Sequence, residues 1–245
     1  MRRRLLLGLY YWYLWVSIIS AKHSCVGVQF RVSRLTQASF TATVPTIVEQ
    51  LGYKSALAQL MTIPIYVTAL LFVLGFAWWS DHMQQRTPFI IAGFAIACVG
   101  FIGELAIPHP AYTGASYFFL FLIAIGLYSP FICIVCLIAN NLAPSSKRAV
   151  GMAVLISVGN WGGICGSNIF IAKQAPRYWA GYGTGLGICF AGIIAAFVLR
   201  FAYARENKRR DEFMVGKTDE EVRAKYTEQE LLDLGDRSPF FRYTL

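Results

Sequence analysis

The chain has 245 residues, of which 56% are hydrophobic and only 14% are charged, and its formal net charge is +9. A soluble domain of this length does not need so few charges. The basic excess belongs to the apolar part, because only Glu49, Asp81 and Glu104 are acidic before residue 204. Basic residues scattered at the ends of apolar runs are typical of membrane topology signals, whereas nucleic-acid-binding proteins cluster them on one face. We expect a multi-pass membrane protein that contacts the lipid bilayer and no nucleic acid.

Residues 1–39 form an atypical N-terminal segment. Three arginines precede a short apolar run at residues 5–20, which is long enough for about 24 Å of helix. The run is either a short or tilted span, which we favour because it is long and aromatic-rich, or a signal peptide. The next stretch, AKHSCVGVQFRVSRLTQASF, is neither apolar enough to span a bilayer nor patterned enough to predict a helix.

Five longer runs follow. Each meets the roughly 20 residues that a hydrocarbon core of about 30 Å requires. They are residues 56–79, 88–107, 116–139, 149–172 and 179–204. Together with the first run they predict an all-α membrane protein with about six transmembrane helices, in which residues 40–204 form a half-bundle of antiparallel neighbours.

The distribution of basic residues predicts the orientation. Positive charge in the loops between spans marks the cytoplasmic side. By this rule Arg86, Arg148 and the basic run at 205–210 lie inside, so the polar tail at 205–245 is cytoplasmic. Four basic residues conflict with this topology, because it places them outside: Lys22, Arg31, Arg34 and Lys54.

The tail contains two helix-start signals. TDEE at 218–221 and TEQE at 227–230 both fit the capping box, in which a Ser or Thr precedes a Glu by three residues. We expect two short solvated helices without chemistry, the second ending at Gly235.

Signatures of an enzyme, a metal site or a cofactor site are missing from the sequence. The three histidines are isolated from one another, and no His/Glu pair has metal-ligand spacing. Cys133 and Cys136 have the spacing of a redox or zinc pair but lack a second pair and polar surroundings. We therefore predict no enzyme, no metal and no cofactor.

The stretch SVGNWGGICGSNIF at 157–170 combines small residues with a polar amide. Gly159 and Gly163 are four residues apart, as are Gly162 and Gly166, a spacing that lets another helix pack closely. Asn160 lies near mid-membrane, where a polar side chain must face protein or a water-filled cavity. Two interpretations stay open for Asn160: substrate contact, or a hydrogen bond that only ties helices together.

Other candidates lie at further points along the spans. Trp161, Tyr66 and Tyr128 are either cavity walls or lipid-facing rings. Glu104 lies near the outer end of its span, where it is either exposed to outside water or carries a proton.

WWSDHMQQR at 78–86 places an acid beside basic residues where the hydrophobicity breaks. We interpret it as the cytoplasmic turn between two antiparallel spans, with the tryptophans at the interface. Arg86 or Arg148 is the expected partner of Asp81, and the three residues form a predicted cytoplasmic gate.

Several of these stretches also occur together in one known family. They are residues 45–70, 80–90, 140–170, 175–187, 206–211 and 236–245, the last reading DRSPFFRYTL. They resemble the fungal allantoate permease family, the anion:cation symporter branch of the major facilitator superfamily. The resemblance covers about residues 40–245 and implies helices seven to twelve of a twelve-helix transporter, whose two halves rock around a central site.

The resemblance also implies a function. Members carry small organic anions such as allantoate, nicotinate, biotin or pantothenate, typically with protons, across the plasma membrane. In this sequence the resemblance assigns transport to Asn160 with its neighbouring glycines and to Asp81 with Arg86. Two positions depart from the family pattern, since His82 stands where Arg usually follows the Asp, and Ala77 stands where a Gly is common.

Because helices equivalent to the first half are missing, we expect a truncated gene or gene model. We predict no transport by this chain unless it dimerises or pairs with a missing N-terminal half. The alternative function is a non-transporting membrane scaffold or regulator that associates with full-length permeases through its glycine seams.

Overall fold

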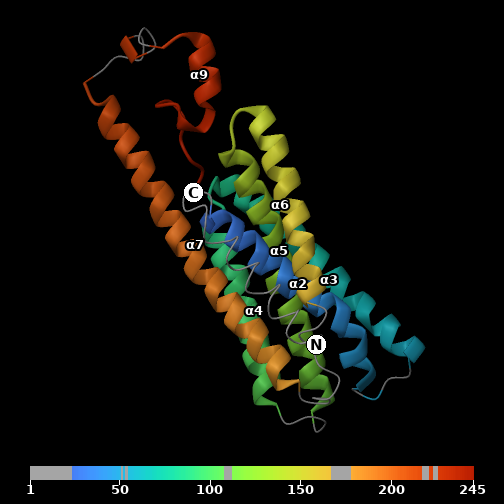
Figure 1. Cartoon of the computed structure of the whole chain (residues 1–245). Coiled ribbons are helices and arrows are strands. Elements are labelled where there is room, and N and C mark those ends of the chain that lie inside the picture. The colour runs from blue at the N-terminus through green and yellow to red at the C-terminus, as the bar shows by residue number, and fades with distance from the viewer. Residues whose placement is uncertain are drawn as a thin grey trace.

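The computed structural model describes residues 24–50, 52, 55–107, 112–166, 178–216, 221–222 and 226–245, so the apolar run at 5–20 lies outside them. Over these residues the secondary structure is helical and contains no strand. The long helices are α2 (Ser24–Gln50), α3 (Ser55–Met83), α4 (Thr87–Ala106), α5 (Thr113–Asn141), α6 (Ser145–Gly166) and α7 (Trp179–Met214) (Figure 1). A short helix α9 (Glu228–Leu234) and a 3-10 turn η2 (Gly235–Arg237) follow.

Four of these helices are long and apolar enough to cross a membrane: α3 over Ala56–Met83, and α4, α5 and α7 over their full lengths. They coincide with four of the five predicted spans, and the predicted all-α membrane fold is confirmed. The remaining predicted span, 149–172, overlaps α6. The described part of α6 ends at Gly166 and begins with the polar sequence SSKR, which lowers its hydropathy.

Helix α2 corrects the sequence interpretation. The stretch 21–40, for which no helix was predicted, is helical from Ser24 onward, because it belongs to α2, which is 27 residues long and packs against α3, α5, α6 and α7. Phe30, Phe40 and Val44 are almost fully buried there. Since protein rather than lipid surrounds much of α2, the helix does not need to be apolar on all sides.

The course of α2 also removes the topology conflict at Arg31 and Arg34. Both residues lie within the helix, rather than in an outer loop as predicted. The helix contains the predicted domain boundary at residues 39 and 40.

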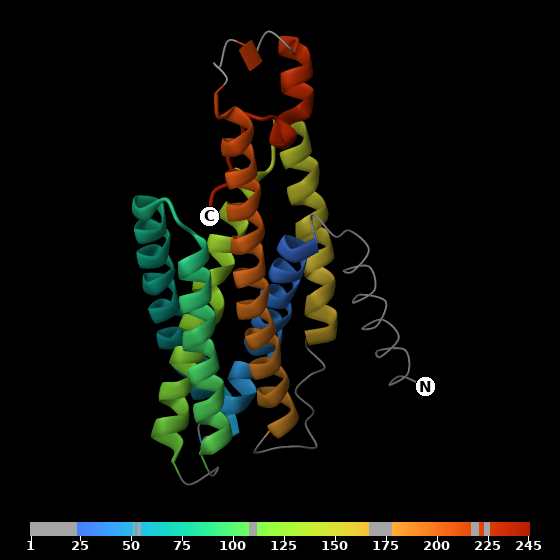
Figure 2. The ribbon, with the colours of Figure 1, turned by 90° about the vertical axis from the view of Figure 1, so that its left-hand side faces the viewer.

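Small residues allow the closest helix contacts. An added Cβ at Gly93 on α4 would overlap the ring of Pro130 on α5, and one at Gly126 on α5 would overlap the backbone of Ala97 on α4. Helix α4 packs against both α5 and α7, and α5 also packs against α2 and α3 (Figure 2). The small-residue seams therefore hold α4 and α5 together at close range.

One end of the bundle, which we call the tail end, gathers the α3–α4 loop, the α5–α6 loop and the C-terminal end of α7 (Figures 1 and 2). Helix α7 has 36 residues, or about 54 Å, and its C-terminal end extends beyond α3 and α4 (Figure 2). The final residues return to this end. The N–H of Arg86 donates to the carbonyl of Leu245 over 2.7 Å, and that of Asp236 donates to Ala143 over 3.3 Å.

The second predicted tail helix is confirmed. Thr227 and Glu230 form the expected capping box at the start of α9, and Gly235 ends the helix with φ = 53°. Most of the first predicted tail helix, at 218–221, lies outside the described residues.

Candidate functional site

The charged centre of the candidate site is Arg34 on α2. It lies ten residues into the helix, about 15 Å along the axis from Ser24, which places its charge within the bundle. Its Nη2 donates to Oδ1 of Asn160 on α6 over 2.7 Å. Its Cζ lies 4.9 Å from the ring centroid of Phe131 on α5, within range of a cation–π interaction. Three helices therefore meet at this guanidinium.

Gly159 on α6 allows α6 to approach α2 closely enough for this contact. An added Cβ at Gly159 would overlap Cε1 of Phe30 and lie 3.3 Å from Cγ of Arg34. Phe30 in turn packs on Phe131, with 5.5 Å between the ring centroids. Any larger residue at position 159 would push α6 away from α2 and lengthen the bond between Arg34 and Asn160.

A hydroxyl cluster lies on the same side of α2. Thr41 is seven residues after Arg34, so the two share one face of the helix. Its Oγ1 lies 2.7 Å from the hydroxyl of Tyr128 on α5. The ring of Tyr66 on α3 meets that of Tyr128 edge-on, with 6.0 Å between the centroids. We call Arg34, Thr41, Tyr66, Tyr128 and Asn160 the Arg34 face.

The guanidinium of Arg34 has hydrogen-bond donors beyond the one that Asn160 accepts. Among the described residues no carboxylate pairs with Arg34, which has only the amide oxygen of Asn160 and the face of Phe131. A guanidinium carries five N–H donors and binds a carboxylate with two parallel hydrogen bonds. One donor is used by Asn160, and the tyrosine and threonine hydroxyls add further polar contacts nearby. The face therefore presents a guanidinium and several hydroxyl groups on neighbouring helices.

Sequence reasoning identified Tyr66, Tyr128 and Asn160 but missed Arg34 and Thr41. These two were assigned to the atypical N-terminal segment or its border rather than to a helix. An arginine and a threonine at a spacing of seven would have been the signal once a helix was recognised. The side chain of Trp161 and the surroundings of Gly162, Gly163 and Gly166 lie outside the description.

At the tail end, the structure joins two of the three predicted gate residues. Asp81 forms an ion pair with Arg86. Arg148 is not part of this pair, because its Nε donates to the carbonyl of Leu142 over 3.1 Å. The backbone of Arg86 also holds Leu245, so the pair adjoins the C-terminus.

Glu104 lies at the opposite end of α4 and is 1% exposed. Ser116 on α5 donates a hydrogen bond of 2.7 Å to its Oε2. The interpretation that outside water reaches Glu104 is wrong, since α5 covers the carboxyl group. A proton-carrying role stays a prediction.

Comparisons with known proteins identify the class and then the family. The described residues form six long helices, four of them long and apolar enough to cross a membrane, which is the architecture of a multi-pass membrane protein. A family model described as "Major Facilitator Superfamily" matches residues 30–235, and the chain belongs to this superfamily. No solved structure matches the chain significantly.

Fungal transporters are among the similar curated proteins. The MFS-type transporter cnsO of Penicillium expansum is 36% identical over 210 residues, which are 84% of this chain and 40% of that protein. The high-affinity nicotinic acid transporter of Saccharomyces cerevisiae is 28% identical over 231 residues, 94% of this chain and 42% of that protein. The chain thus spans about two fifths of the length of these relatives.

Proposed function

We propose that this chain is the C-terminal half of an alternating-access permease for a small organic anion, in which Arg34 contacts the substrate. The observation that carries the proposal is the guanidinium within the bundle, which has an amide and a ring as partners but no carboxylate among the described residues. A charge at such a depth is costly and marks a substrate or ion pathway.

The length of the match supports the proposal of a half transporter. Residues 30–235 match the superfamily model, while the chain covers 40% and 42% of two relatives. Transporters of this kind bind substrate between two halves. A missing N-terminal half, or another copy of the chain, would supply the facing wall of the Arg34 face.

The substrate we propose is a carboxylate or vitamin-like anion. Arg34 would pair with the carboxylate, while Tyr66, Tyr128 and Phe131 would contact a planar or apolar body. The relative named as a nicotinic acid transporter supports this class, as does the resemblance to the allantoate permease branch. Asn160 would orient Arg34, and Glu104 is the candidate for proton coupling.

The orientation we propose places the tail end in the cytoplasm of a plasma-membrane protein. Arg86, Lys147, Arg148 and the basic run at 205–210 all lie at this end. Their common position agrees with the rule that cytoplasmic loops carry excess positive charge.

The test is uptake of radiolabelled nicotinate and other small carboxylates by cells expressing this chain alone or together with the N-terminal half of a fungal relative. We expect uptake only when both halves are present. Arg34→Gln should lower it about tenfold or more, whereas Arg34→Lys should retain part of it. Arg242→Gln, which removes an exposed charge outside the Arg34 face, is the matched control.

Equal uptake by wild type and Arg34→Gln would overturn the role of Arg34. Robust uptake by the chain alone, as a monomer, would overturn the proposal that it is half of a transporter. The alternative function of a scaffold or regulator requires glycines that are free to contact a helix of another protein. Gly159 is already in contact with Phe30 and Arg34 of α2. Co-purification with a full-length permease without any transport would favour that alternative.

A further inference from the structure

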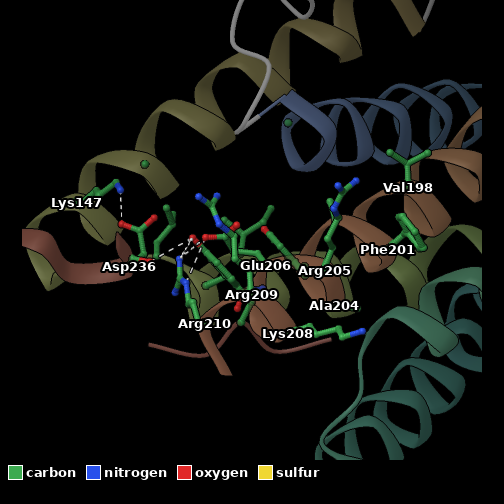
Figure 3. A pocket seen from close by; sticks show the side chains of 18 of the residues that line it. Lys147, Val198, Phe201, Ala204, Arg205, Glu206, Lys208, Arg209, Arg210 and Asp236 are labelled. Atoms are coloured by element: carbon green, nitrogen blue, oxygen red, sulfur yellow. Dashed lines mark hydrogen bonds and ion pairs between the residues drawn. The ribbon is translucent and has the colours of Figure 1, made fainter. Parts of the chain in front are cut away.

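A second cavity lies away from the Arg34 face, at the tail end of the bundle. It is a groove of about 2260 Å³ between α6 and α7. Residues of α5 contribute to its lining, and Asp236 and Tyr243 border it from the C-terminal segment. Figure 3 shows charged side chains gathered toward Lys147 and Asp236, with Phe201 and Val198 at the other end.

The α7 wall changes from apolar to basic along one helical stripe. Phe197, Phe201, Arg205 and Arg209 follow one another at intervals of four residues and all line the groove. The stripe extends over about 18 Å. Phe201 is 71% exposed, so its ring is available to a molecule in the groove.

The α6 wall changes in the same direction. Ser146 and Lys147 line the groove near the tail end, and Val150, Gly151 and Leu155 line it further along. Val150 is 65% exposed. Both walls are therefore polar at the tail end and apolar toward the centre of the bundle, as the environment of an amphipathic ligand requires.

The depth of this transition matches the surface of a bilayer. Arg205 lies 26 residues after Trp179, which is about 39 Å along α7. Hydrocarbon core and headgroup layers together measure about 40–45 Å. With Trp179 at the opposite interface, Arg205 lies in the headgroup layer and Phe201 at the edge of the hydrocarbon.

Not every cation in the groove has an ion-pair partner among the described residues. Lys147 pairs with Asp236, and Arg210 contacts Glu206 over 3.4 Å and donates to the carbonyl of Phe241. In contrast, Arg205, Lys208 and Arg209 have no ion pair or hydrogen bond within the described ranges and are exposed. Three positive charges on one turn of α7 therefore face the groove without an ion-pair partner among the described residues.

We propose that this groove binds an anionic phospholipid, whose headgroup lies among Arg205, Lys208 and Arg209 and whose acyl chains lie along Val198, Phe201 and Val150. Basic pockets between transmembrane helices on the cytoplasmic side are suited to such headgroups. Residues 1–23 contain four basic residues and no acidic one, so charge complementarity favours an anionic lipid over that segment as the occupant of the basic end. The site is separate from the proposed anion pathway and independent of its substrate.

The test is native mass spectrometry of the full chain in detergent with added dioleoylphosphatidylserine or dioleoylphosphatidylcholine. Wild type should bind the first phosphatidylserine at least tenfold more tightly than phosphatidylcholine. Removing each cation should weaken this preference about fivefold. The variant R205Q/R209Q should therefore lose most of it, while R148Q/R242Q, with the same loss of charge outside the groove, should keep it.

A third variant, Phe201→Asn, separates a lipid from a soluble anion, since it should weaken phosphatidylserine binding without changing the charge. Circular dichroism and size-exclusion profiles identify any variant that does not fold, and the single substitution Lys208→Gln then replaces it. Equal binding of the two lipids by wild type would overturn the proposal. So would unchanged binding by R205Q/R209Q, or full displacement of the lipid by millimolar inorganic phosphate.

Discussion

Asn141 at the end of α5 and Thr244 near the C-terminus exchange two hydrogen bonds, although 103 residues separate them. The amide nitrogen of Asn141 donates to the carbonyl of Thr244 over 3.1 Å, and its amide oxygen accepts from the N–H of Thr244 over 2.8 Å. Asn207 on α7 forms the same paired contact with Tyr243, at 2.8 Å in both directions. Two asparagines on different helices thus hold the C-terminal segment as if it were a strand.

Replacing Asn141 with Ala should release this segment. The change leaves the N–H and carbonyl of Thr244 without their partners, at a cost of about 1–3 kcal/mol. Hydrogen exchange in residues 238–245 should become faster, and limited proteolysis should cleave there first. Asn140→Ala is the matched control, because Asn140 is exposed and adjacent. Equal protection in both variants would contradict the role of Asn141.

A methyl group at Gly159 should weaken the contact between α2 and α6. Because the added Cβ overlaps Phe30, Gly159→Ala should lower stability by about 1–3 kcal/mol, measured by thermal unfolding in detergent. Phe30→Leu in the same chain should restore part of this loss. Gly187→Ala is the control, since no atom lies within 4 Å of the added Cβ there. If Gly159→Ala and Gly187→Ala were equally stable, the close contact of α2 with α6 at Gly159 would not contribute to stability.

Glu104 provides a test of proton coupling. If this buried carboxyl group carries the proton, Glu104→Gln should retain substrate binding but make uptake by the paired halves insensitive to an imposed pH gradient. The amide keeps the shape of the side chain and cannot titrate. Glu49→Gln, at an exposed position on α2, controls for the loss of an acid. Uptake that still follows the pH gradient in Glu104→Gln would assign coupling to another residue.

Asp81 tests the predicted gate. Asp81→Ala should lower the uptake rate of the paired halves more than it lowers membrane insertion. Its ion pair with Arg86 is partly exposed, and such pairs contribute only about 0–1 kcal/mol to stability. Uptake rates compared with surface biotinylation separate the two effects. The control is His82→Ala, which removes the neighbouring side chain, and a comparable loss of rate there would contradict a specific role for Asp81.

Acid should loosen the start of α9. Hydrogen bonds from the backbone N–H and hydroxyl of Thr227 lower the pKa of Glu230. Since the pKa is lower in the folded state, the stabilisation is present above the ordinary carboxyl value of 4.5 and is lost as pH falls below it. Hydrogen exchange in residues 228–234, corrected for intrinsic rates, should increase at low pH. Glu230→Gln should show this increase at neutral pH, and Glu228→Gln should not.

The sequence predicts elements well where lipid or a local motif determines them. Helices α3, α4, α5 and α7 have the long apolar runs that crossing a bilayer requires, and their hydropathy reveals them. The capping box at Thr227 is equally visible, since its two partners are three residues apart.

Features that depend on contacts between residues far apart in the sequence could not be predicted from it. Helix α2 is surrounded by four other helices, which removes the need for a continuous apolar run, and so Arg34 was not placed in the bundle. The pairing of Arg34 with Asn160 joins residues 126 positions apart. Asn141 and Asn207 hold the C-terminal segment through its backbone, and Tyr243 stacks on Tyr203 of α7, so these contacts join residues that lie far apart in the sequence.

The contact between Arg86 and Leu245 makes the C-terminus a reporting position. A fluorophore attached beyond Leu245 would lie next to the Asp81–Arg86 pair, without any label inside the membrane. Its emission would follow changes in polarity as that pair opens or closes.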